Sequence, residues 1–249
     1  MTDSAAPVVV GVIDLRQGLA VHATAGLRHT YGAVTGIGGR EIRPGDALAL
    51  ANFYAGGLGL EDVYVADLDA IGSRPWNEQT IGGLAAAVPR LWLDAAITTP
   101  EEARRALALG ASRVVVGLET LPSYAALQQI CAAATPERVV LSLDLRDGIT
   151  ITANREISRH TPATEVAARA VQAGVRTIIV LDLARVGMGR GCNLDTIAAV
   201  RKAAPEVTLF AGGGVRDEAD LQHLQEAGCN GALVATALLS GALRPSRRG

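Results

Sequence analysis

Several short apolar runs of this chain end on an aspartate, at the point where a buried strand would pass into a loop. Asp14 and Asp144 end two of these runs, and Asp67, Asp94 and Asp182 end three others. Two carboxyl groups that face each other across a substrate can serve as general base and general acid if their surroundings separate their pKa values. We predict Asp14 and Asp144 as this catalytic pair and the other three as possible substrate-binding residues. A turn or helix-capping role is the alternative for each one alone.

A second group of residues has the composition of an anion-binding loop. Gly212, Gly213 and Gly214 follow an apolar run, and Ala235 and Thr236 begin a short helix after the next run. Consecutive glycines allow backbone N–H groups to turn toward an anion, and a helix N-terminus adds further N–H groups. We predict that Gly213, Gly214, Ala235 and Thr236 bind a phosphate; a tight turn without a ligand is the alternative.

The first loop of the chain is long and rich in glycine, from Leu15 to about Arg43. Loops of this kind often cover a substrate, so Gly18 and His22 are possible substrate-binding residues. A histidine on the surface is the alternative for His22.

The composition argues against several other classes of protein. The formal net charge of −2 and the aromatic content of 3% do not suit a nucleic-acid partner. The three cysteines are far apart and no histidine ends an apolar run, so we expect no metal and no cofactor. No apolar run approaches the ~18 residues of a membrane span, and no signal peptide is evident. We expect a cytoplasmic monomer or small homo-oligomer whose partner is a phosphorylated small molecule.

Apolar runs rich in Val, Ile and Leu alternate with longer stretches of helical periodicity. Buried parallel strands have this continuous apolar character, and we expect them at Val8–Asp14, Asp62–Leu68, Arg90–Asp94, Arg113–Gly117, Arg138–Asp144, Arg176–Asp182, Val207–Ala211 and Gly231–Ala235. Helices are expected from near Pro44 and Thr99, and over Ala125–Ala133, Ala163–Ala173, Leu194–Ala203 and Asp217–Ala227. This order predicts an α/β fold, a (β/α)8 TIM barrel, with an open doubly wound sheet as the alternative.

The chain also repeats itself. Ile13-Asp14-Leu15-Arg16-Gln17-Gly18 is similar to Leu143-Asp144-Leu145-Arg146-Asp147-Gly148. Two half-barrels, about 1–125 and 126–243, explain this repeat within a single domain of residues 1–249. Residues 244–249 are expected to be a frayed tail.

These residues resemble the histidine-biosynthesis barrels HisA and HisF along nearly the whole chain. The resemblance is carried by Ile13-Asp14-Leu15 with Gly18, by Ser142-Leu143-Asp144 with Gly148, by the three glycines 212–214 and by the repeat. A HisA-like activity is an Amadori rearrangement of an aminoaldose to an aminoketose, in which the resemblance implies Asp14 as general base and Asp144 as general acid. HisF has a lysine in the first loop where this chain has His22, so the resemblance favours the isomerase over the cyclase.

The chain differs from HisA at its first phosphate site. A glycine turn is replaced by Asp94-Ala95-Ala96, and the next loop reads Gly117-Leu118-Glu119. Away from that site, Leu181 stands before Asp182 where HisA has a threonine. A carboxylate repels a phosphate, so Asp94 and Gly117 are predicted to contact another part of the substrate.

Three functions are therefore open. The first is a HisA-like isomerase, or a related lyase, acting on a phosphorylated sugar-like molecule. The second is a divergent paralogue that acts on a monophosphate in the biosynthesis of one-carbon carrier cofactors of the methanofuran or tetrahydromethanopterin type. The chain resembles a side group of the family, found in methanogens and methylotrophs, in phrases such as Val180-Leu181-Asp182-Leu183-Ala184-Arg185. The third is a non-catalytic barrel that binds a phosphorylated ligand.

Overall fold

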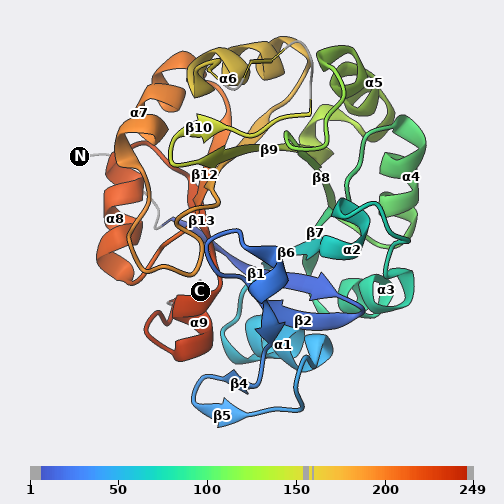
Figure 1. Ribbon diagram of the computed structural model, residues 1–249, viewed down its shortest axis with the longest axis vertical. Helices are drawn as coiled ribbons and strands as arrows, with labels where there is room; N and C mark the ends of the chain where they lie inside the picture. Colours follow the sequence, from blue (N-terminus) through green and yellow to red (C-terminus); the bar gives the residue numbers. More distant parts are fainter. Residues whose placement is uncertain (1–6, 154–156, 159, 246–249) are drawn as a thin grey trace.

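Eight parallel strands form a closed barrel inside a ring of helices (Figure 1). The computed structural model describes residues 7–153, 157–158 and 160–245. The barrel strands are β1 (Val8–Arg16), β6 (Asp62–Asp67), β7 (Arg90–Asp94), β8 (Arg113–Gly117), β9 (Val139–Arg146), β11 (Thr177–Asp182), β12 (Thr208–Gly212) and β13 (Gly231–Val234). Each pairs with the next, and β13 pairs with β1 from Val8↔Gly231 to Gly11↔Val234. The TIM-barrel prediction is confirmed, and the closed ring excludes the open sheet.

Side chains of the barrel strands alternate between the barrel interior and the helix layer. Val10, Tyr64 and Trp92 belong to one buried cluster with residues of the other strands, and this cluster fills the interior. Their neighbours, such as Val9 and Val63, belong to the larger cluster that packs under the helices. Because both faces of each strand are buried, the strands read as continuous apolar runs in the sequence.

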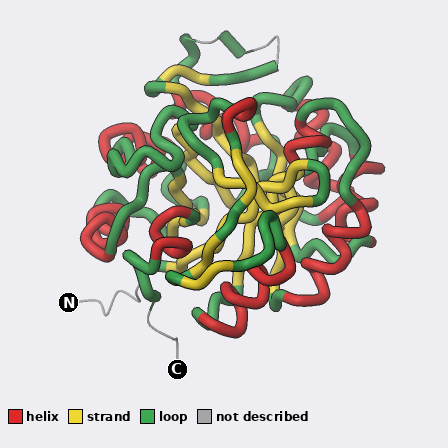
Figure 2. The backbone as a smooth tube through the Cα atoms, turned by 60° about the horizontal axis from the view of Figure 1, so that its bottom comes forward, coloured by secondary structure: helices red, strands yellow, loops and turns green. Residues whose placement is uncertain are grey.

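The outer layer consists of α1 (Ala47–Asn52), α3 (Glu78–Ala87), α4 (Pro100–Ala108), α5 (Tyr124–Ala134), α6 (Ala163–Gln172), α7 (Leu194–Ala203) and α8 (Glu218–Glu226). Figure 2 shows these helices outside the strands of the barrel. Helix α1 continues into one turn of π-helix (Phe53–Gly57). Two shorter helices, α2 (Leu68–Ile71) and α9 (Thr236–Ser240), follow β6 and β13 directly.

Helix α4 begins at Pro100, next to the predicted start near Thr99. Thr99 accepts a hydrogen bond from the backbone of Glu102, whose side chain accepts one from the backbone of Thr99, and Pro100 is the first residue of the helix. Helix α3 is absent from the sequence prediction. Gly82 and Gly83 interrupt its helical pattern, and burial of Ile81 and Leu84 against the barrel outweighs that cost.

Each half of the barrel carries a hairpin on its first strand. Strand β2 (Leu19–His22) folds back on β1, and β10 (Ile149–Thr150) folds back on β9. The turn residues have positive φ in both hairpins, with Gln17 at 54° and Gly18 at 74°, and Asp147 at 52° and Gly148 at 77°. Two-residue turns of this type match the strand twist. The sequence repeat thus has a structural counterpart.

The first loop contains three more short strands and one helical turn. The strands are β3 (Gly32–Ala33), β4 (Gly36–Ile37) and β5 (Arg40–Glu41), and the turn is Arg28–Thr30. Strand β4 lies against α9, where Gly38 donates a backbone hydrogen bond to Leu239. In the part of the chain that the structure describes, no helix is long and apolar enough to cross a membrane. The predicted frayed tail falls mostly on residues 246–249, outside the described residues.

Candidate active site

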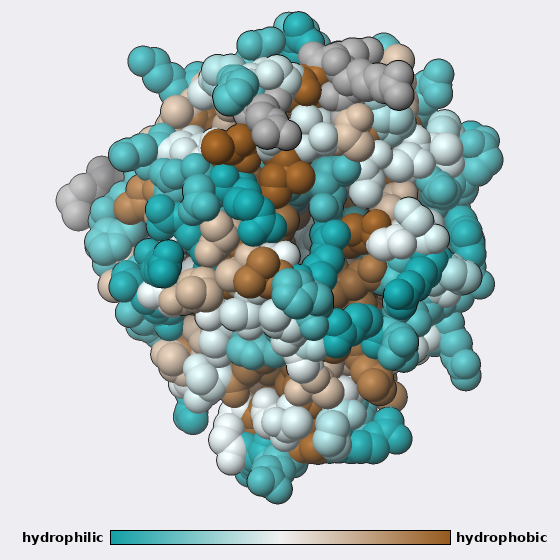
Figure 3. Space-filling view, viewed as in Figure 1, coloured by the Kyte–Doolittle hydropathy of each residue, from teal (hydrophilic) through white to brown (hydrophobic). Residues whose placement is uncertain are grey.

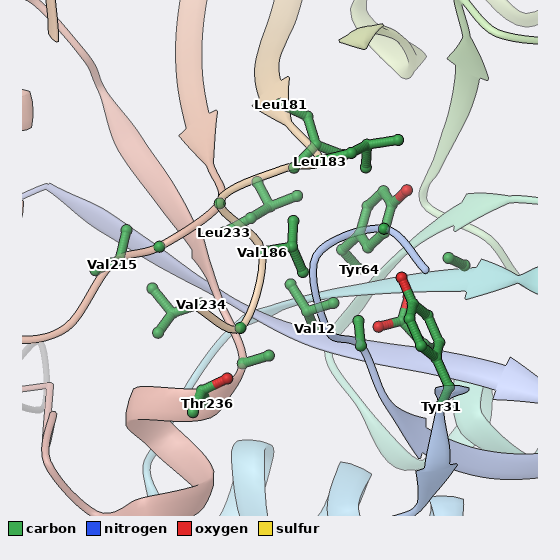
Figure 4. Close-up of a pocket in the computed structure, with 18 of the residues that line it drawn as sticks. Val12, Tyr31, Tyr64, Leu181, Leu183, Val186, Val215, Leu233, Val234 and Thr236 are labelled. Carbon is green, nitrogen blue, oxygen red and sulfur yellow. The ribbon is translucent and has the colours of Figure 1, made fainter. Parts of the chain in front are cut away.

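A cavity of about 290 Å³ opens at the carboxyl ends of the barrel strands. The mouth of the barrel is hollowed near the middle of the face in Figure 3. Figure 4 shows Thr236 at one end, Tyr31 and Tyr64 at the other, and apolar side chains such as Val12 and Leu233 between them. Of the predicted site residues, seven line the cavity: Asp14, Asp94, Asp144, Gly213, Gly214, Ala235 and Thr236.

Strand alternation brings three of the five predicted aspartates into this cavity. Asp94 lies two residues beyond the inward Trp92, and Asp144 lies four beyond the inward Val140. Asp14 and Asp94 are both register partners of Ala66, on the strands to either side of β6. Their carboxyl groups line the same cavity, and the charge of Asp94 raises the pKa of Asp14.

The carboxyl groups of Asp94 and Asp144 are buried, at 6% and 4% exposure. Tyr64 donates its hydroxyl hydrogen to Asp94 Oδ2 at 3.0 Å. The Ser142 hydroxyl lies 2.6 Å from Asp144 Oδ1, and the backbone N–H of Glu119 donates to Asp144 Oδ2 at 3.2 Å. Burial raises the pKa of Asp94 to about 7 and that of Asp144 well above its ordinary value, and the Glu119 carboxylate adds to both shifts.

Asp14 has a different environment from the other two. No residue in the described ranges donates a hydrogen bond to its carboxylate, which lines the cavity. Burial raises the pKa of Asp14 to about 7, the guanidinium of Arg28 opposes that rise and Asp94 adds to it. A carboxyl group with a pKa near 7 is partly ionised at neutral pH. Asp14 and Asp144 thus differ in their hydrogen-bond partners, while burial raises the pKa of both.

The first loop crosses the mouth of the barrel and carries Arg28 and Tyr31 into the cavity lining. Arg28 forms an ion pair with Glu119, which follows β8. Arg16 donates hydrogen bonds to the backbone carbonyls of Arg28 and Tyr31 and so holds this part of the loop. Ala25 donates its backbone hydrogen to Val186, in the loop after β11, at 2.7 Å. The loop therefore covers the carboxyl groups, as its length and glycine content predict.

The other end of the cavity is formed by the turn after β12 and by the start of α9. No acceptor in the described part of the chain takes a hydrogen bond from the backbone N–H of Gly213, Gly214 or Thr236. His22 Nε2 lies 2.9 Å from Thr236 Oγ1. Arg216 also lines the cavity, but its guanidinium binds both oxygens of Asp220 at 2.8 and 2.7 Å. Backbone donors and one hydroxyl are thus available to an anion here.

The turn needs its glycines for packing as well. A Cβ on Gly213 would lie 2.5 Å from the carbonyl oxygen of Asp182, and one on Gly214 would lie 2.8 Å from that of Gly191. Both glycines have a φ of 94°, which other residues rarely adopt. Close packing therefore accounts for these glycines whether or not they bind an anion.

The structure does not bring Asp67 and Asp182 to the cavity. Each lies one residue beyond an inward position, because Ala66 and Leu181 are the inward residues of β6 and β11. Asp67 accepts hydrogen bonds from Asn77 and caps α2, and Asp182 accepts from the backbone of Asp147 and Ala184. One step along a strand reverses the side-chain direction, so both carboxylates hold loops instead of facing a substrate.

The remaining predicted residues, Gly18, Gly117 and His22, do not line the cavity. Gly18 is in the turn between β1 and β2, where a Cβ would meet Thr80 of α3, so it is outside the cavity. Gly117 ends β8 beside the carboxyl groups that line the cavity. A Cβ on Gly117 would lie 3.5 Å from Asp94 Oδ2 and 3.6 Å from Asp144 Oδ2. His22 reaches the cavity only through Thr236.

The lining residues that were not predicted as site residues include Arg28, Tyr31, Tyr64 and Glu119. The alternation of β6 could have indicated Tyr64, which stands two residues before the inward Ala66. The positions of Arg28 and Tyr31 depend on the path of the first loop, and no local sequence pattern predicts that path. Within the described residues, no group of three His, Cys, Asp or Glu side chains could hold a metal ion.

A closed (β/α)8 barrel with carboxyl groups, a glycine turn and a helix N-terminus around one cavity at its carboxyl-end face is a TIM-barrel enzyme in architecture. The chain belongs to the histidine biosynthesis protein family, which matches residues 8–244. The predicted resemblance is thereby confirmed.

The names of several relatives agree with this assignment. A protein of Halorhodospira halophila is 31% identical over 241 residues, which are 95% of this chain and 93% of its own length. A protein of Thermomicrobium roseum is 31% identical over 96% of this chain and 95% of its own length, and one of Thermus thermophilus is 29% identical over 95% and 96%. All three are named 1-(5-phosphoribosyl)-5-((5-phosphoribosylamino)methylideneamino) imidazole-4-carboxamide isomerases. The prediction of an enzyme of the isomerase class agrees with these names.

Proposed function

We propose that this protein isomerises a phosphorylated, sugar-like small molecule by general acid–base catalysis, with Asp14 as the base and Asp144 as the acid. One observation carries the proposal: both carboxyl groups line the same cavity as the glycine turn and Thr236. The isomerase names of the relatives support the reaction class.

The environments of the two carboxyl groups suit an aldose–ketose rearrangement. Opening a sugar ring requires a proton on the ring oxygen, which a protonated Asp144 can supply. The rearrangement then requires removal of the proton from C2, which an ionised Asp14 can accept. The Arg28 guanidinium opposes the rise in the pKa of Asp14, whereas the Glu119 carboxylate adds to the rise in the pKa of Asp144, so these charges act on the two groups in the directions that a base and an acid require. For an aminoaldose this sequence is the Amadori rearrangement.

In this proposal the phosphate of the substrate binds at the end of the cavity formed by the turn after β12 and the start of α9. The free backbone N–H groups of Gly213, Gly214 and Thr236 and the hydroxyl of Thr236 supply donors there. In TIM barrels the loops after the seventh and eighth barrel strands, which are β12 and β13 here, commonly form a phosphate site.

A second candidate is favoured by the acidic end of the cavity. Asp94 and Glu119 line it together with Asp144, which suits a substrate with one phosphate better than the two phosphoribosyl groups in the relatives' names. This candidate is a divergent paralogue acting on a monophosphate, in one-carbon carrier biosynthesis or a comparable route. The non-catalytic alternative is disfavoured, because both carboxyl groups line an open cavity and neither Asp14 nor Asp144 forms an ion pair with a described residue.

Solvent deuterium exchange tests the reaction class. The protein is incubated in D₂O with phosphorylated aldoses and aminoaldoses, including the relatives' substrate, and deuterium at C1 of the ketose product and at C2 of the recovered aldose is measured by mass spectrometry. We expect label in at least one compound, and a loss of about 100-fold or more in Asp14→Asn and Asp144→Asn. Glu206→Gln, an exposed change away from the cavity, is the control. Unchanged exchange in both variants would overturn the proposal.

Growth separates the two candidates. Expression in a strain that lacks the histidine-biosynthesis isomerase restores growth only if the chain accepts the relatives' substrate. If the protein catalyses deuterium exchange into a monophosphate but does not restore growth of that strain, the second candidate is supported.

A further inference from the structure

The two repeat-related strands differ in one side chain next to the aspartates of the proposed mechanism. Strand β9 has Ser142 two residues before Asp144, and β1 has Val12 two residues before Asp14. Successive side chains of a strand point to opposite faces, so residues two positions apart lie on the same face. A hydroxyl therefore stands beside one carboxyl group, whereas an apolar side chain of the cavity wall stands beside the other (Figure 4).

The Ser142 hydroxyl has Asp144 as its partner. Its oxygen lies 2.6 Å from Asp144 Oδ1, and Asp144 Oδ2 accepts the backbone hydrogen of Glu119 at 3.2 Å. Within the described residues, no other group forms a hydrogen bond with this hydroxyl. Ser142 is 1% exposed, so loss of the contact would leave a buried hydroxyl unpaired. A hydroxyl can donate or accept, and the contact therefore suits both the ionised and the protonated form of Asp144.

The backbone holds both of these donors in place. Ser142 lies within β9, which pairs with β8 on one side and with β11 on the other. The carbonyl oxygen of Ser142 accepts the backbone hydrogen of Leu118 at 2.9 Å, and Leu118 immediately precedes Glu119. The strand that carries the hydroxyl is thus joined to the loop that carries the second donor, so the two keep a fixed position relative to Asp144.

Negative charge and burial oppose the ionised form of Asp144. The other titratable groups at this part of the cavity are Asp14 on β1, Arg28 and Tyr31 on the first loop, Tyr64 on β6, Asp94 on β7 and Glu119 after β8. Glu119 and Asp94 raise the pKa of Asp144, as burial does. Leu181, the register partner of Asp144 on β11, carries no charge. A carboxylate at Asp144 therefore needs hydrogen-bond donors.

The serine and the valine suit different roles in proton transfer. Hydrogen bonds from the Ser142 hydroxyl and the Glu119 backbone favour the Asp144 carboxylate. Asp14 has Val12 in place of the serine and no donor among the described residues. A group that releases a proton gains from donors to its anion, whereas a group that accepts a proton is more basic without them.

We propose that Ser142 is a positioning residue of the isomerisation, whose hydroxyl holds the Asp144 carboxyl group and stabilises the carboxylate left when the proton passes to the ring oxygen of the substrate. The electron pair of the broken O–H bond stays on Asp144, where each carboxyl oxygen then has a donor. Ser142 does not line the cavity, so it acts through Asp144. This inference rests on the proposed function, in which Asp144 is the acid.

Titration of Asp144 tests the contact without a substrate. The carboxyl carbons of the aspartate side chains are followed by nuclear magnetic resonance as the pH changes, and Asp144→Asn identifies the signal. Ser142→Ala removes a donor to the carboxylate, so the pKa of Asp144 should rise by about one pH unit. Ser142→Cys supplies a weaker donor and should raise it by less. Thr177→Val, which removes a buried hydroxyl at the start of β11, is the matched control and should leave it in place.

The pH dependence of deuterium exchange tests the role in the reaction. An acid must hold its proton, so the rate falls above the pKa of that group. In Ser142→Ala this basic limb should move to higher pH by about one unit and kcat should fall about tenfold. KM should stay within about twofold, because Ser142 does not line the cavity. Thr177→Val should keep the profile of the wild type.

The outcomes separate this inference from the proposed function. If the titration or the basic limb stays in place in Ser142→Ala while the wild type exchanges deuterium, the inference is wrong and the proposed function stands. An equal loss of kcat in Thr177→Val would also overturn the inference, since removal of any buried hydroxyl would then suffice. If the wild type exchanges no compound but the titration moves in Ser142→Ala, the proposed function fails and the hold of Ser142 on Asp144 is supported.

Discussion

His22 and Thr236 stand at opposite ends of the barrel sequence, yet His22 Nε2 lies 2.9 Å from Thr236 Oγ1. His22 ends the hairpin on the first strand, and Thr236 begins the helix after the last strand. The contact joins the first loop to the phosphate end of the cavity. We therefore expect the position of that loop to affect binding at that end.

Removal of the Thr236 hydroxyl should weaken phosphate binding. Thr236→Val keeps the shape of the side chain, but it loses a hydrogen-bond donor worth about 1 kcal/mol, so the Kd of an alkyl phosphate should rise about fivefold. His22→Ala in the same background should add less than it does alone, because the two side chains are in contact. Calorimetry of the double-mutant cycle measures this coupling, and strictly additive effects would contradict it.

The stability of the protein should fall as the pH rises from about 4 to about 7. In that window the folded protein keeps a proton on Asp14 and Asp94, with pKa values of about 7, while the unfolded chain, at 3.8, has lost it. Each group thus lowers the free energy of unfolding by ~1.4 kcal/mol per pH unit, and its effect levels off above pH 7. Denaturant titrations of Asp14→Asn should show a flatter profile than the wild type. A profile of unchanged slope argues against a raised pKa.

Replacement of Arg28 should move the pH dependence of catalysis. The guanidinium opposes the rise in the pKa of Asp14, so Arg28→Ala should raise that pKa further and shift the acid limb of the pH–rate profile toward higher pH. Arg28→Lys retains a positive charge and should shift it less. Because the ion pair with Glu119 is partly exposed, stability should change by only about 1 kcal/mol or less. An acid limb at the same pH in all three proteins would contradict the assignment.

A methyl group at Gly213 should destabilise the fold. The backbone has a φ of 94°, and a Cβ would lie 2.5 Å from the carbonyl oxygen of Asp182. We expect Gly213→Ala to cost about 2 kcal/mol or more. Gly83→Ala in α3 is the matched control, because nothing lies within 4 Å of its Cβ, and helix propensity should make it stabilising by up to ~1 kcal/mol. Thermal unfolding of both variants measures the difference, and equal shifts would be inconsistent with the close packing.

The sequence is sufficient to predict the strands and the barrel, because burial on both faces leaves continuous apolar runs. The predicted runs Arg90–Asp94 and Arg113–Gly117 coincide with β7 and β8. The sequence is less informative about side-chain direction. Asp67 and Asp182 end apolar runs as Asp14 does, but they lie one step further along their strands, and only the register between strands reveals this.

The contents of the cavity were predictable only in part. Asp14, Asp144 and the glycine turn follow from strand ends and local composition. Arg28 reaches the acidic end because Arg16 holds the backbone of the first loop, a contact between residues that no periodic pattern links. Loops of this length have many possible paths, so their contacts emerge only when the barrel is complete.

The pairing of β13 with β1 has a consequence for biosynthesis on the ribosome. The first strand is made early, but one of its two edges is covered only when Gly231–Val234 arrives. Until then the backbone groups of Val8–Gly11 are open to pairing with another nascent chain. Chaperone dependence should therefore be concentrated in the interval before the last strand emerges, and a stop codon just ahead of Gly231 should yield an aggregating product rather than a soluble partial barrel.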